Sequence, residues 1–315
     1  MRIFLSLSLN TARDIIRQPA IAVLTVAAIV TIGILPVIAV FSLGQEERIV
    51  RDGAMASCFV YGLFLVVFSS VASIFKQVRS GTAGSVLCKP VSRELFFGAT
   101  YCGIVLVCLV FVVIAVLSAM LSVRMALLGL QTDWLVGILF AAAFLSAFVI
   151  AGVLNYRGHN FYSALFRVLL LSLLLALLVV ACLDPDGRLV RFGALIRWEL
   201  LPVALLMFAA LAMLSAIAVA LSTRFAPVVV FSCCCLVFVL GLLSDYLFIT
   251  VAGGASWAGF CAAILPNWQC LWVYGSLEGN GALTPGYVLQ ALSYAALYIT
   301  GVLCLGIMSF QDAET

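Results

Sequence analysis

Two residues of this sequence have the types that hydrolyse an acyl bond, but they are predicted to lie far apart. His159 is the only histidine, and Ser256 lies in the run Gly254-Ala255-Ser256-Trp257-Ala258. A histidine base must come within about 3 Å of its serine nucleophile. The hydropathy pattern described below places His159 inside and Ser256 outside a membrane, about 30 Å of hydrocarbon apart. We therefore expect no catalytic residue in this chain.

Asp245 is the other ionisable residue whose position could matter for function. It lies near the outer end of a long apolar run, beside Tyr246. An ionisable group at membrane depth is a candidate for a substrate path. The alternative is that Asp245 reaches the water at the membrane surface.

The cysteines and lysines predict neither a metal site nor an ATP site. Most of the 11 cysteines lie in apolar runs, as in Cys233-Cys234-Cys235, where they behave as small hydrophobic residues. Cys261 and Cys270 could form a disulfide in an oxidising compartment, and two unpaired thiols are the alternative. No G-x-x-x-x-G-K-[ST] motif occurs, so the chain cannot hold ATP phosphates by that route. We expect no cofactor and no metal.

A basic polar segment, residues 76–96, interrupts the apolar sequence. It contains both lysines of the protein, Lys76 and Lys89, together with Arg79 and Arg93, and only Glu94 opposes them. By the positive-inside rule, this segment faces the cytoplasm. It predicts a short surface helix between two membrane spans, and a loop that only fixes the topology is the alternative.

The composition is that of a polytopic membrane protein. Hydrophobic residues make up 66% of the chain and charged residues 9%, with a mean hydropathy of +1.29. Soluble domains have about a quarter charged residues. The net charge of +3 comes from basic residues spread over several loops, so nucleic acid is not an expected partner.

The apolar runs predict an all-α fold with about eight transmembrane helices in a single domain, residues 1–315. The predicted spans are 20–43, 54–75, 97–123, 134–155, 165–183, 200–221, 228–250 and 287–310. Residues 1–18, which end before Pro19, predict an amphipathic helix at the membrane surface, and a basic flank that only fixes the topology is the alternative. Residues 251–272 include an apolar run too short to cross, which predicts an outer re-entrant or interfacial helix.

The distribution of basic residues predicts that both termini are cytoplasmic. Ten of the 16 Lys and Arg residues fall on the inner side of this topology, and six fall on the outer side. The six include Arg188, Arg191 and Arg197, whose outer position depends on the count of spans before them.

Four short segments of the sequence resemble motifs of a known protein family. They are Asn10-Thr11-Ala12-Arg13-Asp14, Gly81-Thr82 with Lys89-Pro90-Val91-Ser92-Arg93, Leu221-Ser222-Thr223-Arg224-Phe225, and Leu265-Pro266-Asn267-Trp268-Gln269. Together they resemble motifs of the permease subunits of type 2, exporter-like ABC transporters. The resemblance implies an N-terminal elbow helix and six family-like spans, with residues 134–183 as an inserted hairpin.

The resemblance also implies which residues contact a partner ATPase. In that family, the segment after the second span looks like a coupling helix that docks into the ATPase, and the second cytoplasmic turn contacts it less. The residues that match are Gly81, Thr82, Ser85, Lys89, Pro90, Ser92, Arg93, Thr223 and Arg224. Trp268, in the outer segment, joins Asp245 and Tyr246 as a candidate for the substrate path.

The function that the resemblance implies is ATP-driven transport, with export as the direction, across the inner (plasma) membrane. The expected partners are two copies of a separate ABC ATPase, a second copy of this permease or a related one, and membrane lipid. The alternatives are a membrane assembly protein without transport and an intramembrane serine hydrolase, because the run around Ser256 resembles the G-x-S-x-A context of rhomboid proteases.

Overall fold

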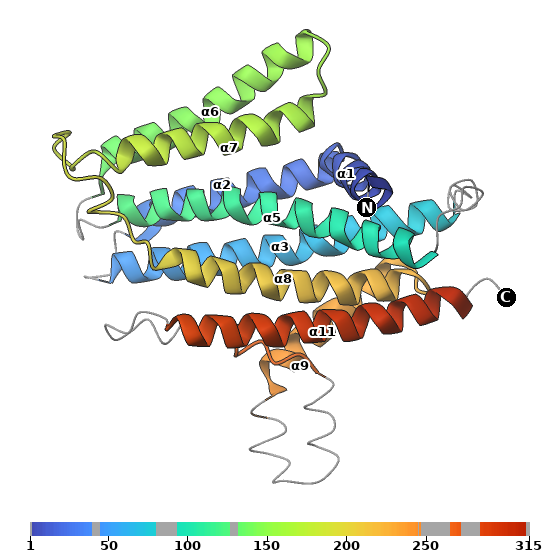
Figure 1. The fold of residues 1–315 in the computed structure, drawn as a ribbon. Helices are drawn as coiled ribbons and strands as arrows, with labels where there is room; N and C mark the ends of the chain where they lie inside the picture. Colours follow the sequence, from blue (N-terminus) through green and yellow to red (C-terminus); the bar gives the residue numbers. More distant parts are fainter. Residues whose placement is uncertain are drawn as a thin grey trace. The chain divides into compact units, whose positions relative to one another are not determined.

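The computed structural model describes residues 2–39, 45–79, 93–126, 132–244, 246, 265–271 and 284–312, most of which are helical. Nine helices follow one another in these ranges (Figure 1). The described residues contain no strand, only an isolated bridge between Leu183 and Leu189. The prediction of an all-α chain is therefore confirmed. The helices are α1 (Arg2–Ile16), α2 (Pro19–Ala39), α3 (Glu46–Arg79), α5 (Arg93–Met125), α6 (Trp134–Tyr156), α7 (Phe161–Val180), α8 (Leu200–Ser222), α9 (Pro227–Leu242) and α11 (Pro285–Asp312).

Seven of the described helices are long and apolar enough to cross a membrane, namely α2, α3, α5, α6, α7, α8 and α11. The prediction of a multi-pass membrane protein is confirmed to this extent. The expected span at 228–250 is described as α9, which has 16 residues, while residues 245 and 247–250 lie outside the described part. The count of eight spans stays a prediction.

The predicted N-terminal helix at 1–18 is present as α1. It ends at Ile16, and α2 begins at Pro19, whose fixed φ suits the first turn of a helix. Ser8, Thr11 and Ile15 form its buried face, while Ile3 and Leu5 are more than half exposed. Its role as a membrane-surface elbow stays a prediction.

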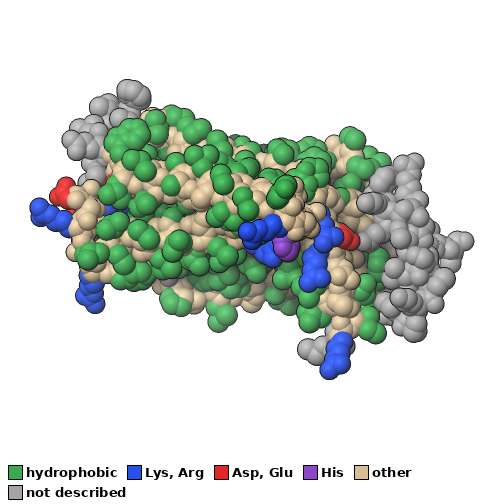
Figure 2. All heavy atoms as spheres, turned by 90° about the horizontal axis from the view of Figure 1, so that it is seen from above, with side chains coloured by type: hydrophobic (Ala, Val, Ile, Leu, Met, Phe, Trp, Pro, Cys, Tyr) green, Lys and Arg blue, Asp and Glu red, His purple; other side chains and the backbone are tan. Residues whose placement is uncertain are grey.

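The outward faces of α6 and α7 are apolar. Figure 2, which looks onto these helices, shows hydrophobic side chains over most of the surface and only a few charged ones. Ile138 and Val149 are each 67% exposed and Leu175 is 64% exposed. Such a surface is stable only against lipid or another apolar surface.

The chain divides into two compact units. Unit 1 comprises Met1–Thr11, Val66–Val105 and Leu205–Thr315, and unit 2 comprises Ala12–Leu65 and Leu106–Ala204. Four helices, α1, α3, α5 and α8, contribute residues to both units. The contacts below are therefore given within each unit.

In unit 2, α6 and α7 form the hairpin predicted at residues 134–183. Asp133 caps the start of α6 by accepting a hydrogen bond from the Val136 amide, and Asn160 caps α7 in the same way through Ser163. Gly158, in the turn between them, has a φ of +89°, a conformation that glycine adopts without strain. Local sequence thus sets both ends of this hairpin.

Buried polar contacts join α2 to its neighbours in unit 2. The Ser122 hydroxyl of α5 donates to the Ile32 carbonyl at 2.7 Å. Thr31 and Tyr61 share a hydrogen bond of 2.9 Å between their hydroxyls. Bonds of this kind hold helices together in an environment where water cannot compete for them.

Candidate functional site

Most of the predicted ATPase-coupling residues lie outside the described part of the chain. This holds for Gly81, Thr82, Ser85, Lys89, Pro90 and Ser92. Arg93 begins α5, but its side chain is not described. The candidate site is therefore built from the two helices that flank residues 80–92.

These two flanking helices are longer than a membrane requires. The α3 helix has 34 residues and α5 has 33, whereas α2, α6, α7 and α8 have between 20 and 23. At about 1.5 Å per residue, α3 and α5 are each about 50 Å long, against a hydrocarbon core of about 30 Å. Each helix is thus about 20 Å longer than the hydrocarbon core is thick.

The first turns of α5 contact three other helices of unit 1. Phe97 packs on α11, where a Cβ added to Gly306 would come within 2.7 Å of the phenyl ring. Tyr101 donates to the Ala212 carbonyl of α8 at 3.2 Å. Gly103 lies against α1, since an added Cβ would be 2.8 Å from the Ser8 carbonyl oxygen. A displacement of the start of α5 would therefore reach α1, α8 and α11 directly.

The second predicted coupling turn contacts the end of α11. Thr223 donates to the Ala220 carbonyl within its own helix end at 2.7 Å. Arg224 donates through Nη2 and Nε to the Ser309 carbonyl, at 3.1 and 3.4 Å. The last carbonyls of a helix have no partner within the helix and carry partial negative charge, so the guanidinium stabilises this end. Contact of Thr223 and Arg224 with an ATPase stays a prediction.

The described part of the outer segment, residues 265–271, is anchored by Trp268. Its side chain is 1% exposed, and its indole donates to the Val237 carbonyl of α9 at 3.4 Å. The indole lies directly on Gly241, where a Cβ would overlap it. Gln269 adds a side-chain bond to the Leu242 carbonyl at 3.0 Å. In this structure Trp268 packs against α9 rather than facing open space.

Helix α11 connects this outer segment to the start of α5. The Tyr294 hydroxyl accepts a bond from the Asn267 amide at 3.0 Å, and the Tyr287 hydroxyl donates to the Cys270 carbonyl at 2.7 Å. Gly306, which Phe97 contacts, lies about 28 Å beyond Tyr287 along the same helix, at 1.5 Å per residue. One helix of unit 1 therefore contacts both the start of α5 and residues 267–270.

The remaining candidates are placed as follows. Tyr246 is 60% exposed, while Asp245, Ser256 and Cys261 lie outside the described residues. His159 is exposed in the turn between α6 and α7. Among the described residues, no group of His, Cys, Asp and Glu could hold a metal ion.

Three polar segments of unit 2 meet at one end of that unit. Glu47, at the start of α3, pairs with Arg197 at 2.6 Å, and this hydrogen bond raises the pKa of Arg197 above its usual value. Arg124, at the end of α5, pairs with Asp133 at 3.0 Å and lies 3.5 Å from the Leu183 carbonyl. The segments that are predicted to face outward thus lie together in unit 2, and the side they face stays a prediction.

Sequence reasoning did not find the Arg124–Asp133 pair. The predicted topology places both residues in an outer loop, between the spans at 97–123 and 134–155, yet each side chain is only 2% exposed. The one signal in the sequence is Asp133 directly before the apolar run of α6, a typical helix cap. Its partner could not be inferred, because an ion pair depends on how the ends of α5 and α6 lie in three dimensions and not on a local sequence pattern.

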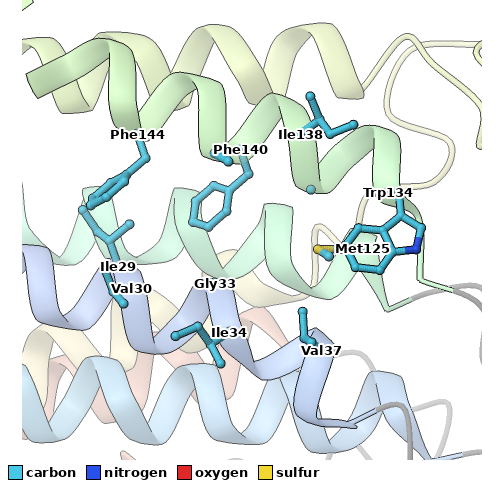
Figure 3. A pocket seen from close by; sticks show the side chains of 12 residues that line it. Ile29, Val30, Gly33, Ile34, Val37, Met125, Trp134, Ile138, Phe140 and Phe144 are labelled. Carbon is cyan, nitrogen blue, oxygen red and sulfur yellow. The ribbon is translucent and has the colours of Figure 1, made fainter. Parts of the chain in front are cut away.

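An apolar groove lies between α2 and α6 in unit 2. Its volume is about 380 Å³. In Figure 3, Phe140 and Phe144 point from α6 toward α2, and Trp134 and Met125 lie at one end. A Cβ at Gly33 would overlap the Phe140 ring, so glycine lets the ring approach α2 here. The lining side chains are apolar except for the indole nitrogen of Trp134.

Comparison of the chain with protein-family models, curated proteins and solved structures finds no match.

Proposed function

We propose that this chain is the membrane-spanning permease subunit of an ABC transporter of the type 2 class. The observation that carries the proposal is the setting of the basic segment at 76–96. It joins the ends of two helices about 50 Å long, and α5 contacts α11, α8 and α1 within Phe97–Gly103. A segment mounted in this way suits a docking point whose movement must reach the rest of a unit.

The contacts of unit 1 suggest how such a movement would travel. Closure of an ATPase would displace the segment and the start of α5. Phe97 would pass the displacement to α11 at Gly306, and Tyr294 and Tyr287 would pass it to residues 267–270. Interfaces between packed helices shift as rigid bodies rather than deform continuously, so a small displacement at one end reaches the other.

The partners follow from what the chain itself supplies. Its sequence has no G-x-x-x-x-G-K-[ST] motif, so we assign ATP hydrolysis to a separate subunit, expected in two copies. A second permease, identical or related, would complete the transport path. We infer export across the inner (plasma) membrane, with both termini in the cytoplasm, from the family resemblance.

The experiment is a charge reversal at the docking point. Arg93→Glu leaves three basic residues to hold the segment inside, so insertion should be normal. Reversing one charge at a docked interface should cost about 2–5 kcal/mol. We therefore expect the ATPase to dissociate during co-purification, or to hydrolyse ATP without stimulation by substrate. Arg157→Glu, in the exposed turn between α6 and α7, is the matched control.

The outcomes separate the proposal from its competitors. Normal assembly and normal stimulation in Arg93→Glu would remove the docking role of the segment. Loss only in Arg157→Glu would move docking to the inserted hairpin. A chain that never co-purifies with an ATPase would fit a membrane assembly protein without transport.

A further inference from the structure

A second groove, in unit 1, combines an apolar interior with a positively charged mouth. It lies between α8, α9 and α11, closed on one side by Leu265 and Pro266, and its volume is about 450 Å³. Ligand sites in proteins have volumes of about 300–1,000 Å³, so this one is large enough for a small molecule or a single chain of a lipid.

The groove is elongated along α11. From Tyr298 to Ser309, the residues of α11 that line it fall on successive turns of the helix, which places them on one face. These residues span about 16 Å at 1.5 Å per residue. A hydrocarbon core of about 30 Å has two leaflets, so the groove is about as long as one leaflet is deep.

The mouth of the groove lies at the ends of the helices. Arg224 and Phe225, which follow the end of α8, line it there together with Ser309. Arg224 is exposed, and its guanidinium lies at the Ser309 carbonyl. This position corresponds to the depth at which lipid phosphates lie when α8 and α11 cross a bilayer. Arginine binds phosphate with short, charge-assisted hydrogen bonds.

We propose that this groove binds one membrane phospholipid, with an acyl chain along α11 and the phosphate at Arg224. Length, apolar walls and a single cation at headgroup depth together select this occupant. A soluble anion would leave the apolar walls unoccupied, and an uncharged hydrocarbon would not use Arg224. The bound lipid would join α8, α9 and α11, and the inference does not depend on transport.

We propose no ligand for the groove between α2 and α6. Its lining residues are apolar, with Trp134 and Met125 at one end. Nothing in that lining selects one hydrophobic occupant over another.

The test uses the full-length chain, purified in mild detergent and stripped of lipid. Phosphatidylglycerol and diacylglycerol with the same acyl chains are added separately, and binding is measured by native mass spectrometry. We expect one phosphatidylglycerol to bind at least about tenfold more tightly than diacylglycerol, because only the former offers a phosphate. Arg224→Gln should remove this difference, and Arg224→Lys should keep part of it.

Two substitutions on α11 locate the binding site. Val302→Trp fills the groove and should abolish binding of both lipids. Leu297→Trp is the control, because Leu297 is 75% exposed and is absent from the groove lining. Equal binding in Val302→Trp and Leu297→Trp would overturn the site. Equal affinity for the two lipids in the unmodified chain, or no effect of Arg224→Gln, would overturn the phosphate contact. Arg224→Gln changes an exposed side chain, so this variant should fold. It therefore tests the phosphate contact even if Val302→Trp fails to fold.

Discussion

The guanidinium of Arg124 and the carboxylate of Asp133 form an ion pair of 3.0 Å, in which each side chain is only 2% exposed. Asp133 also accepts a hydrogen bond from the Val136 amide, so the pair fixes the start of α6 against the end of α5. The attachment of the α6–α7 hairpin within unit 2 therefore depends on two buried charges that need each other.

Breaking this pair from one side should destabilise the protein strongly. Arg124→Met leaves the Asp133 carboxylate buried without its cation, which should cost about 3–5 kcal/mol. Adding Asp133→Asn removes the unpaired charge and keeps an oxygen to cap α6, so the double variant should recover much of the loss. Thermal unfolding in detergent measures both. An equal loss in the single and double variants would contradict this account.

The ion pair between Glu47 and Arg197 should matter far less. Its side chains are 29% and 45% exposed, so water screens the attraction. Arg197→Gln should change the free energy of unfolding by less than about 1 kcal/mol. The same unfolding assay applies, and a loss comparable to that of Arg124→Met would show that exposure does not distinguish the pairs.

Gly103 should tolerate no side chain. An added Cβ would meet the Ser8 carbonyl oxygen and the Thr11 Cβ, each at 2.8 Å, so Gly103→Ala should move α1 away from α5 and destabilise unit 1 by about 1–3 kcal/mol. Gly152, in α6, has nothing within 4 Å of the same added atom. Gly152→Ala should therefore be neutral or stabilise the helix by up to about 1 kcal/mol. Equal effects at the two positions would contradict the close packing of α1.

Thiol labelling should report the topology. In a variant that carries serine at Cys270 and Cys304, the exposed cysteines among the described residues, Arg48→Cys and Asp186→Cys should react with an impermeant reagent from the outer side. Cys88 and Arg157→Cys should react only from the cytoplasmic side. Arg48 follows Glu47, and Asp186 lies in the same loop as Arg197. Because Glu47 and Arg197 are in contact, both introduced cysteines should react from the same side. Labelling of Asp186→Cys from the inside alone would show that the spans before it are miscounted.

Tyr294 should affect the transmission of movement from α11 to residues 267–270, and not the binding of the ATPase. Tyr294→Phe removes the hydroxyl that accepts from the Asn267 amide, at a cost of about 0.5–1.5 kcal/mol, or about twofold to tenfold. We expect the transport rate to fall by about twofold to tenfold, while the ATPase still co-purifies with the chain. Tyr156→Phe is the control, because Tyr156 is 94% exposed. Unchanged transport in Tyr294→Phe would remove this hydrogen bond from the proposed path.

Local features of the sequence predicted the elements well, because each depends on neighbouring residues alone. Pro19 marked the boundary between α1 and α2, and the polar residues between 156 and 163 marked the turn of the hairpin. Contacts between distant residues were not predictable. Nothing near Gly306 indicates that it receives Phe97, and nothing near Arg224 indicates that it caps α11, because such contacts depend on how helices pack rather than on any one segment.

The length of α5 has a consequence for the membrane around it. Its apolar residues continue from Leu95 to Val123, which corresponds to about 43 Å of helix against about 30 Å of hydrocarbon. Tilting alone cannot remove such a mismatch, since helices rarely tilt beyond about 40°. The excess is covered where Ser8 and Thr11 of α1 lie on Gly103 and Phe4 lies near Gly98. Helix α1 thus covers locally a part of α5 that a thicker bilayer would otherwise have to cover.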